Sequence, residues 1–301
     1  MTPDFCDIMR RNTIGKLLII ALLLCCIAAV FLLFGKDIKQ MSDPVAVKNA
    51  ETMPVFLERK WEKNHDKNED YIAQIVFDSG IIDLPVVQAY NGLYDRNGDY
   101  YIFYDDKGNE VKEDKACVDG CNGYYCDGND VYLRTDWKSR EYSAFGSNFF
   151  DYRNSFEDQN LIIYGHHASR SHFGDKKAQK QQFTILDTLM DEENYKDNAA
   201  FSLTFKDQIR NYVIVAVLKI DITDERCMQA YRINMDRDLE GGEDDGFFDE
   251  YLMIIEDNEC YDTGVSLEKE DRFVTLSTCI EGDDNGRELI IAKEVSRKIY
   301  Q

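Results

Sequence analysis

Two residues near the end of the chain have the types and spacing for nucleophilic chemistry. Cys279 ends a segment rich in β-branched and aromatic residues, 272–279, and Arg287 opens a second apolar segment, 287–292. The polar stretch 281–286 predicts a turn, so the two segments are expected to pair with Cys279 and Arg287 at one end. A nearby cation favours the thiolate, which is the nucleophilic form of cysteine. The alternative is a buried structural cysteine, the commoner role of a lone cysteine.

A histidine that can assist such a thiol follows an apolar segment in the middle of the chain. Residues 161–167 are Leu-Ile-Ile-Tyr-Gly-His-His. This pattern predicts a strand that ends at Gly165 and places His166 directly after the strand end. An imidazole can tune a thiol and then protonate an amine leaving group. The alternative is a surface histidine in a turn, and His172 is expected in a loop near the same mouth.

These segments resemble the class B sortases, cysteine transpeptidases of Gram-positive cell surfaces. Residues 275–279, Thr-Leu-Ser-Thr-Cys, match the TLxTC signature of sortases, with Tyr-Gly-His at 164–166 upstream. The resemblance covers about residues 43–300 and includes 144–153, which has one extra residue, and 261–279 after a helix-bearing connection. It implies a mainly β fold, an eight-stranded sortase β-barrel with N-terminal helices and a helix in a long late loop.

The resemblance also implies a role for each candidate catalytic residue. Cys279 is the nucleophile, and His166 rather than His167 is the acid–base group because the family's histidine directly follows the glycine. Arg287 donates hydrogen bonds to the substrate backbone or to the developing oxyanion, a task that suits a guanidinium fork. The alternative for Arg287 is an ion pair with the acidic residues of the turn before it.

The substrates follow from the same resemblance. Cys279 would cleave the C-terminal sorting-signal pentapeptide of a surface protein after threonine, form a thioester, and pass the acyl group to an amine of peptidoglycan or of another protein. Leu276, Ser277 and Thr278 are expected to line the peptide groove, with strand packing as the alternative for Leu276. No metal or organic cofactor is required. A cysteine peptidase that releases its product to water and a non-catalytic anchored binding domain are the other functions considered.

The elements that must position these residues are mostly short strands. Helices are expected at 45–53 and 55–65, with a third as an option at 70–77. Strands are expected at 84–88, 100–104, around 149, 161–164, 201–205 and 212–218, and further helices at 183–190 and 247–255. Short strands separated by turn residues favour an all-β barrel or sandwich over a βαβ fold.

An apolar run at 17–34 predicts a transmembrane anchor. Its 18 residues would rise about 27 Å as a helix, close to the roughly 30 Å of a hydrocarbon core. Lys16 and Lys36 flank the run. The alternatives are a lipoprotein and a cleaved signal peptide, whose apolar core is only about 7–15 residues. Basic residues before the run favour a cytoplasmic N-terminus at 1–16, with the catalytic domain extracellular.

The remaining chain divides into a linker with N-terminal helices at 35–80 and a catalytic barrel at 81–301. Within the barrel, 91–130 is an insert that is atypical of the family and is expected to be a peripheral appendage. It holds three cysteines, Cys117, Cys121 and Cys126. Their spacing does not match a zinc ribbon, and their pairing is open.

Composition limits the partners of the protein. The 301 residues include 57 acidic and 35 basic side chains, which gives a formal charge of −22. Such a charge argues against binding to nucleic acid or to an anionic membrane surface. The acidic stretch 240–245 does not fit the spacing of an EF-hand, so a solvated loop is expected there.

Overall fold

The computed structural model describes residues 53–105, 107–111, 128–169, 174–178, 180–235 and 246–300. The chain divides into two compact units, Met1–Ala50 and Glu51–Gln301, and every described residue lies in the second. The predicted anchor at 17–34, nearly all of the predicted helix at 45–53, the insert cysteines, His172 and the acidic stretch 240–245 lie outside the described residues. Within the described ranges, no helix has the length and apolar character needed to cross a membrane.

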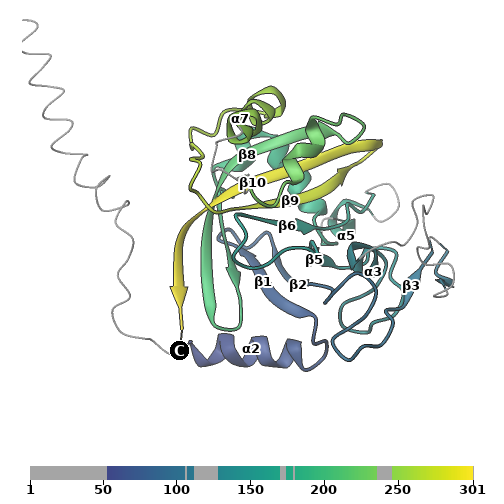
Figure 1. The fold of residues 1–301 in the computed structure, drawn as a ribbon. Helices are drawn as coiled ribbons and strands as arrows, with labels where there is room; N and C mark the ends of the chain where they lie inside the picture. The colour runs from purple at the N-terminus through teal and green to yellow at the C-terminus, as the bar shows by residue number, and fades with distance from the viewer. Residues whose placement is uncertain are drawn as a thin grey trace, which may run out of the picture. The chain divides into compact units, whose positions relative to one another are not determined.

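Eight strands form a closed barrel in the order β1-β2-β5-β6-β9-β10-β8-β7 (Figure 1). Their bounds are β1 (Tyr71–Phe77), β2 (Asp83–Val87), β5 (Asn148–Phe150), β6 (Asn160–Tyr164), β7 (Ala200–Thr204), β8 (Gln208–Asp221), β9 (Phe273–Ile280) and β10 (Asp283–Ile299). The pairs β2–β5 and β6–β9 are parallel, and the other pairs of the barrel are antiparallel. The expected mainly β fold with an eight-stranded barrel is confirmed.

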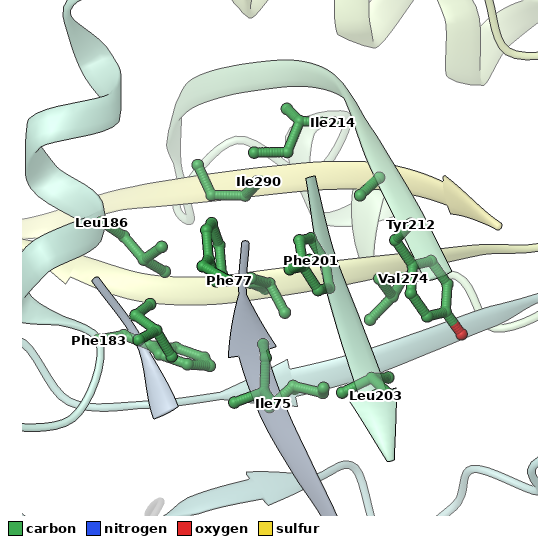
Figure 2. Packing of buried hydrophobic residues seen from close by; sticks show 14 of the residues in the cluster. Ile75, Phe77, Phe183, Leu186, Phe201, Leu203, Tyr212, Ile214, Val274 and Ile290 are labelled. Atoms are coloured by element: carbon green, nitrogen blue, oxygen red, sulfur yellow. The ribbon is translucent and has the colours of Figure 1, made fainter. Parts of the chain in front are cut away.

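Apolar side chains fill the barrel interior (Figure 2). Phe77 on β1 and Phe201 on β7 stack with their ring centroids 4.8 Å apart, and Ile290 on β10 belongs to the same cluster. The 3₁₀ helix η2 (Thr184–Met190) adds Leu186 to this cluster, so the helix predicted at 183–190 is present as a 3₁₀ helix. Side chains that alternate between the two faces of each strand therefore give the barrel one apolar interior.

A second apolar cluster lies outside the barrel, where α7 (Phe247–Asn258) packs against β8 and β10 (Figure 1). The rings of Tyr251 on α7 and Phe273 on β9 lie 5.6 Å apart. The helix buries residues at helical spacing, namely Phe247, Phe248, Tyr251, Ile254 and Ile255. The amphipathic helix predicted at 247–255 is confirmed, and it continues to Asn258.

The shorter elements complete the described chain. They are α2 (Val55–His65), β3 (Phe103–Tyr104), β4 (Glu110–Val111), α3 (Gly128–Leu133), α5 (Asp175–Ala178), α6 (Glu192–Tyr195) and η3 (Cys227–Tyr231). The prediction of a helix at 55–65 is confirmed. The optional helix at 70–77 is wrong: these residues form β1, which pairs with strands on both sides, and pairing of this kind overrides local helical spacing. The strand predicted at 100–104 shortens to β3.

The aromatic hairpin of the insert is not peripheral, which corrects our expectation. Tyr101 and Phe103 are buried in a third cluster together with Tyr71 of β1 and Tyr132 of α3. The hydroxyls of Tyr101 and Tyr132 both donate to Asp70 Oδ2, at 2.8 and 2.9 Å. This part of the insert therefore shares a core with the barrel.

Candidate active site

Cys279 and Arg287 lie directly opposite each other in the antiparallel β9–β10 ladder. The expected turn at 281–286 is tighter than predicted, because Ile280 already pairs with Asp283 and Gly282 takes a positive φ of 80°. The ladder then shifts register between Asp283 and Arg287. This irregularity sets the arginine beside the cysteine, so their predicted pairing is confirmed.

The parallel pairing of β6 with β9 brings His166 to the same place. Tyr164 pairs with Ser277, and the Gly165 amide donates to the Ser277 carbonyl at 3.0 Å. His166 follows two residues after Tyr164, and it lines the same cavity as Cys279. A side chain at position 165 would not fit, because its Cβ would lie 2.5 Å from Asn148 Oδ1 and 2.6 Å from the ring of Phe183.

The imidazole of His166 is held by a backbone carbonyl. Its Nε2 lies 2.6 Å from the carbonyl oxygen of Leu133, the last residue of α3. A carbonyl only accepts, so Nε2 carries the hydrogen and Nδ1 keeps the lone pair in the neutral ring. Burial lowers the pKa of His166, with a smaller contribution in the same direction from Arg134, so the neutral ring dominates at neutral pH. His166 is therefore prepared to accept a proton at Nδ1.

Arg287 binds the turn through its backbone. Its Nη1 donates to the carbonyl oxygens of Asp284 and Gly286, at 3.0 and 2.8 Å. Among the described residues, these are the hydrogen bonds of Arg287, and it makes no ion pair with the acidic side chains of the turn. The alternative of pairing with the acidic turn 281–284 is therefore met through the backbone of Asp284 rather than through an ion pair. Nε and Nη2 have no hydrogen bond among the described residues and remain to donate to a substrate.

All three residues line one cavity of about 210 Å³. Its lining consists of Asn129, Asp130, Leu133, Phe149, Tyr164, Gly165, His166, Ser277, Thr278, Cys279 and Arg287. Ser277 and Thr278 reach this cavity as expected, whereas Leu276 does not. Leu276 is buried in the interior of the barrel, so the strand-packing alternative holds for that residue.

Behind one wall of the cavity, Tyr164 and Ser277 contact residues that sequence reasoning missed. The Tyr231 hydroxyl and Ser277 Oγ are 2.8 Å apart, and the rings of Tyr231 and Tyr164 stack at 6.0 Å. Tyr164 in turn donates to Asp151 Oδ2, which also accepts from Asn129 at 3.2 Å. Tyr164 directly precedes the Gly-His pair, and its position could have indicated this wall.

The other expected candidates lie elsewhere. His167 does not line the cavity, and its Nε2 lies 3.7 Å from Asp187 Oδ2 with its side chain 3% exposed. Cys227 is buried and Cys260 is exposed, away from the cavity lining. The described part of the chain contains no group of three or more His, Cys, Asp or Glu side chains arranged to hold a metal ion.

Sequence comparison finds a relative in one known protein. No protein-family model matches the chain. Sortase B of Listeria monocytogenes is 29% identical over 173 residues, which are 56% of this chain and 62% of that protein. The chain thus matches less than two thirds of the length of this curated relative.

Structural comparison finds sortases of the same class from other bacteria. The Staphylococcus aureus sortase B–substrate complex has a TM-score of 0.54 at 20% identity, and the match covers 79% of this chain and 85% of that one. A mutant form of Clostridium perfringens sortase B scores 0.55 at 21% identity and covers 79% and 87%. This chain is similar to the class B sortases and has their fold. A Streptococcus pyogenes class B sortase involved in pilus biogenesis scores 0.53 at 22% identity, over 78% of this chain and 97% of that one. The resemblance read from the sequence is therefore confirmed.

Proposed function

We propose that this protein is a class B-like sortase, a cysteine transpeptidase that cleaves a sorting signal after threonine and transfers it to an amine. The observation that carries the proposal is the convergence of Cys279, His166 and Arg287, from three strand ends, on one cavity. Cysteine next to a guanidinium and a neutral imidazole is the set of groups that acyl transfer through a thioester requires. Similarity to the class B sortases supports the same reaction.

Each group has one task in the first half of the reaction. The sulfur of Cys279 attacks the threonine carbonyl carbon, and the thiol proton passes to His166. The carbonyl oxygen becomes an oxyanion, and the free donors of Arg287 stabilise its charge. The C–N bond then breaks, the leaving amine takes the proton from His166, and a thioester remains on Cys279.

The second half reverses these steps with a different amine. An amine of peptidoglycan or of another protein attacks the thioester and gives its proton to His166, and the sulfur of Cys279 leaves. Ser277 and Thr278 border the cavity, which supports a role for them in contacting the peptide. A single-pass anchor at 17–34, with the barrel on the extracellular side, would bring the site to surface proteins that carry a C-terminal sorting signal.

The decisive experiment measures whether cleavage depends on an amine. Purified protein is mixed with fluorogenic sorting-signal pentapeptides, with and without an added amine nucleophile, and the products are identified by mass spectrometry. We expect an amide product with the added amine, and no turnover by Cys279→Ala, which removes only the sulfur and should keep the wild-type Tm. Cys260→Ala, at an exposed thiol outside the cavity, is the matched control with wild-type activity.

The outcomes separate the alternatives. Hydrolysis alone, unaffected by the amine, would indicate a cysteine peptidase. Cleavage by Cys279→Ala, or no cleavage and no labelling of Cys279 by a thiol reagent, would refute the proposal. For the anchor, full-length protein should fractionate with membranes, and external protease should digest the barrel in intact, wall-stripped cells. Protection of the barrel would reverse the proposed orientation.

A further inference from the structure

The short helix α3 lies between the barrel strand β5 and the hairpin strand β3 of the insert (Figure 1). On one side, Asn129, Asp130 and Leu133 belong to the lining of the active-site cavity. On the other side, Tyr132 is 1% exposed and packs in the third apolar cluster together with Tyr101 of the insert. A helix of six residues is too short to be stable alone, so contacts with other segments determine where its atoms lie.

Hydrogen bonds join α3 to the insert through one buried carboxyl group, that of Asp70. The Tyr132 hydroxyl accepts from Asn68 Nδ2 at 2.8 Å, and the Tyr101 hydroxyl accepts from the Tyr90 amide at 2.9 Å. Each hydroxyl has one hydrogen, which donates to Asp70 Oδ2, at 2.9 Å from Tyr132 and 2.8 Å from Tyr101. Asp70 is 0% exposed, so water does not compete for these bonds. Asp70, Tyr101 and Tyr132 are here called the tyrosine–aspartate group.

The end of α3 carries the carbonyl group that holds His166. The carbonyl oxygen of Tyr132 accepts from the Ser147 amide at 2.9 Å. The next carbonyl oxygen, that of Leu133, lies 2.6 Å from His166 Nε2. Gly146 packs against both groups so closely that a Cβ there would overlap the carbonyl oxygens of Tyr132 and Leu133. The position of the Leu133 carbonyl therefore depends on how the end of α3 is held.

We infer that the tyrosine–aspartate group positions His166, because by fixing α3 it keeps the Leu133 carbonyl against Nε2 and leaves Nδ1 to take the proton of the nucleophile. This inference rests on the proposed function. Asp70, Tyr101 and Tyr132 do not line the cavity, so they are positioning residues that act through Leu133. Since Tyr101 belongs to the insert at 91–130, part of the insert takes part in arranging the active site.

The first test removes one hydroxyl at a time and measures turnover. Tyr101→Phe and Tyr132→Phe each delete one donor to Asp70 and keep the aromatic ring in place. kcat and KM are measured with full-length protein in detergent micelles and a sorting-signal peptide. We expect kcat to fall about 10- to 100-fold, because a displacement of about 1 Å in a reacting group has effects of this size. KM should stay unchanged, since neither side chain lines the cavity.

The second test reports on His166 without any turnover. The chain contains four histidines, so the ring nitrogen resonances of histidine-labelled protein can be assigned by comparison with His166→Ala. In the wild type we expect the neutral His166 ring to carry its hydrogen on Nε2, as the Leu133 carbonyl requires. In both tyrosine variants we expect a mixture of the two tautomers. A residue that only adds stability would lower Tm and leave the tautomer of the folded protein unchanged.

Tyr104→Phe is the matched control for the tyrosine variants. Tyr104 lies on the same hairpin and is 9% exposed. Its hydroxyl is hydrogen-bonded to the backbone of Tyr142 and is not part of the tyrosine–aspartate group. Tyr104→Phe should therefore keep the kcat and the His166 ring resonances of the wild type.

A pair of glycine variants tests the last step, from α3 to His166. Gly146 and Gly264 both have a positive φ, of 46° and 73°, so alanine strains the backbone at either position. A Cβ at 146 would push on the Leu133 carbonyl, whereas a Cβ at 264 meets nothing within 4 Å. Only Gly146→Ala should change the tautomer of His166.

The outcomes are distinguishable. An unchanged kcat and an unchanged His166 tautomer in both tyrosine variants would overturn the inference, and so would a wild-type ring with its hydrogen on Nδ1. An equal fall of kcat in Tyr104→Phe would also overturn it. If Tyr132→Phe does not fold, as judged by circular dichroism, Tyr101→Phe decides by the same two measurements. A wild-type protein that transfers no peptide would refute the proposed function, and the ring resonances would still decide the role of the tyrosines.

Discussion

Replacing Glu288 by glutamine should make the protein more stable, by an amount that grows with pH. Burial raises the pKa of Glu288, so the folded chain holds a proton on this carboxyl up to about pH 8, whereas the ordinary value of 4.5 applies after unfolding. Between these two pH values the unfolded state releases a proton that the folded state keeps, so wild-type stability falls as pH rises through this window. Below pH 4.5 both states are protonated, and the contribution vanishes.

The size of the effect follows from the width of that window. Each pH unit is worth about 1.4 kcal/mol, so the full window from 4.5 to about 8 gives an upper limit of about 5 kcal/mol. For a domain of this size, 1 kcal/mol changes Tm by about 2–4 °C. The Tm of Glu288→Gln minus that of the wild type should therefore rise by up to about 10–20 °C across the window.

The assay is thermal unfolding followed by circular dichroism at half-unit steps from pH 4.5 to 8.5. The reading that matters is the slope of the Tm difference with pH, because any constant effect of the glutamine amide on packing cancels in the slope. Glu281→Gln should run parallel to the wild type, since this carboxyl is exposed when folded. A Tm difference for Glu288→Gln that stays constant within about 1 °C would refute the reasoning.

Three further predictions concern the site itself. Arg287→Lys should lower kcat/KM by about 100-fold or more, since a point charge cannot replace a fork that binds the turn and the oxyanion together; near-normal kcat/KM would make the arginine structural. His166→Ala should abolish peptide turnover, whereas His167→Ala should retain most of it at pH 7; the reverse ranking would mean that the acid–base group is misassigned. Gly165→Ala should lower stability by about 1–3 kcal/mol in denaturant titration, because its Cβ would meet Asn148 Oδ1 at 2.5 Å; an unchanged midpoint would show that the neighbours move aside.

Local sequence was sufficient for the parts of the site that depend on one strand and its end. The segment before Cys279 and the segment before Gly165 are apolar and β-branched, and each is followed by a turn or a glycine. Such patterns show where a strand stops, and strand ends are where Cys279 and His166 lie. The pairing of Arg287 with Cys279 followed because only a short turn separates the two strands.

The parts that failed depend on partners far away in the chain. β1 has residues at helix-like spacing, and only its two neighbours, β2 and β7, make it a strand. Leu133 holds His166 through a backbone carbonyl, which any residue type would supply. The proximity of Glu288 to Asp187 depends on the register of the β9–β10 pair and on the position of η2. Neither can be predicted from one segment of the sequence.

The order of the strands in the barrel determines when the candidate active site can assemble during synthesis on the ribosome. β9 and β10 follow the other six barrel strands along the chain, yet in the closed barrel they lie between β6 and β8. Until this hairpin arrives, β6 and β8 each have an unpaired edge, and the eight-stranded cylinder stays open. The same hairpin carries Cys279 and Arg287. It therefore both closes the barrel and supplies two of the three candidate catalytic residues. The thiol therefore meets His166 in the closed barrel only after all eight barrel strands have been synthesised.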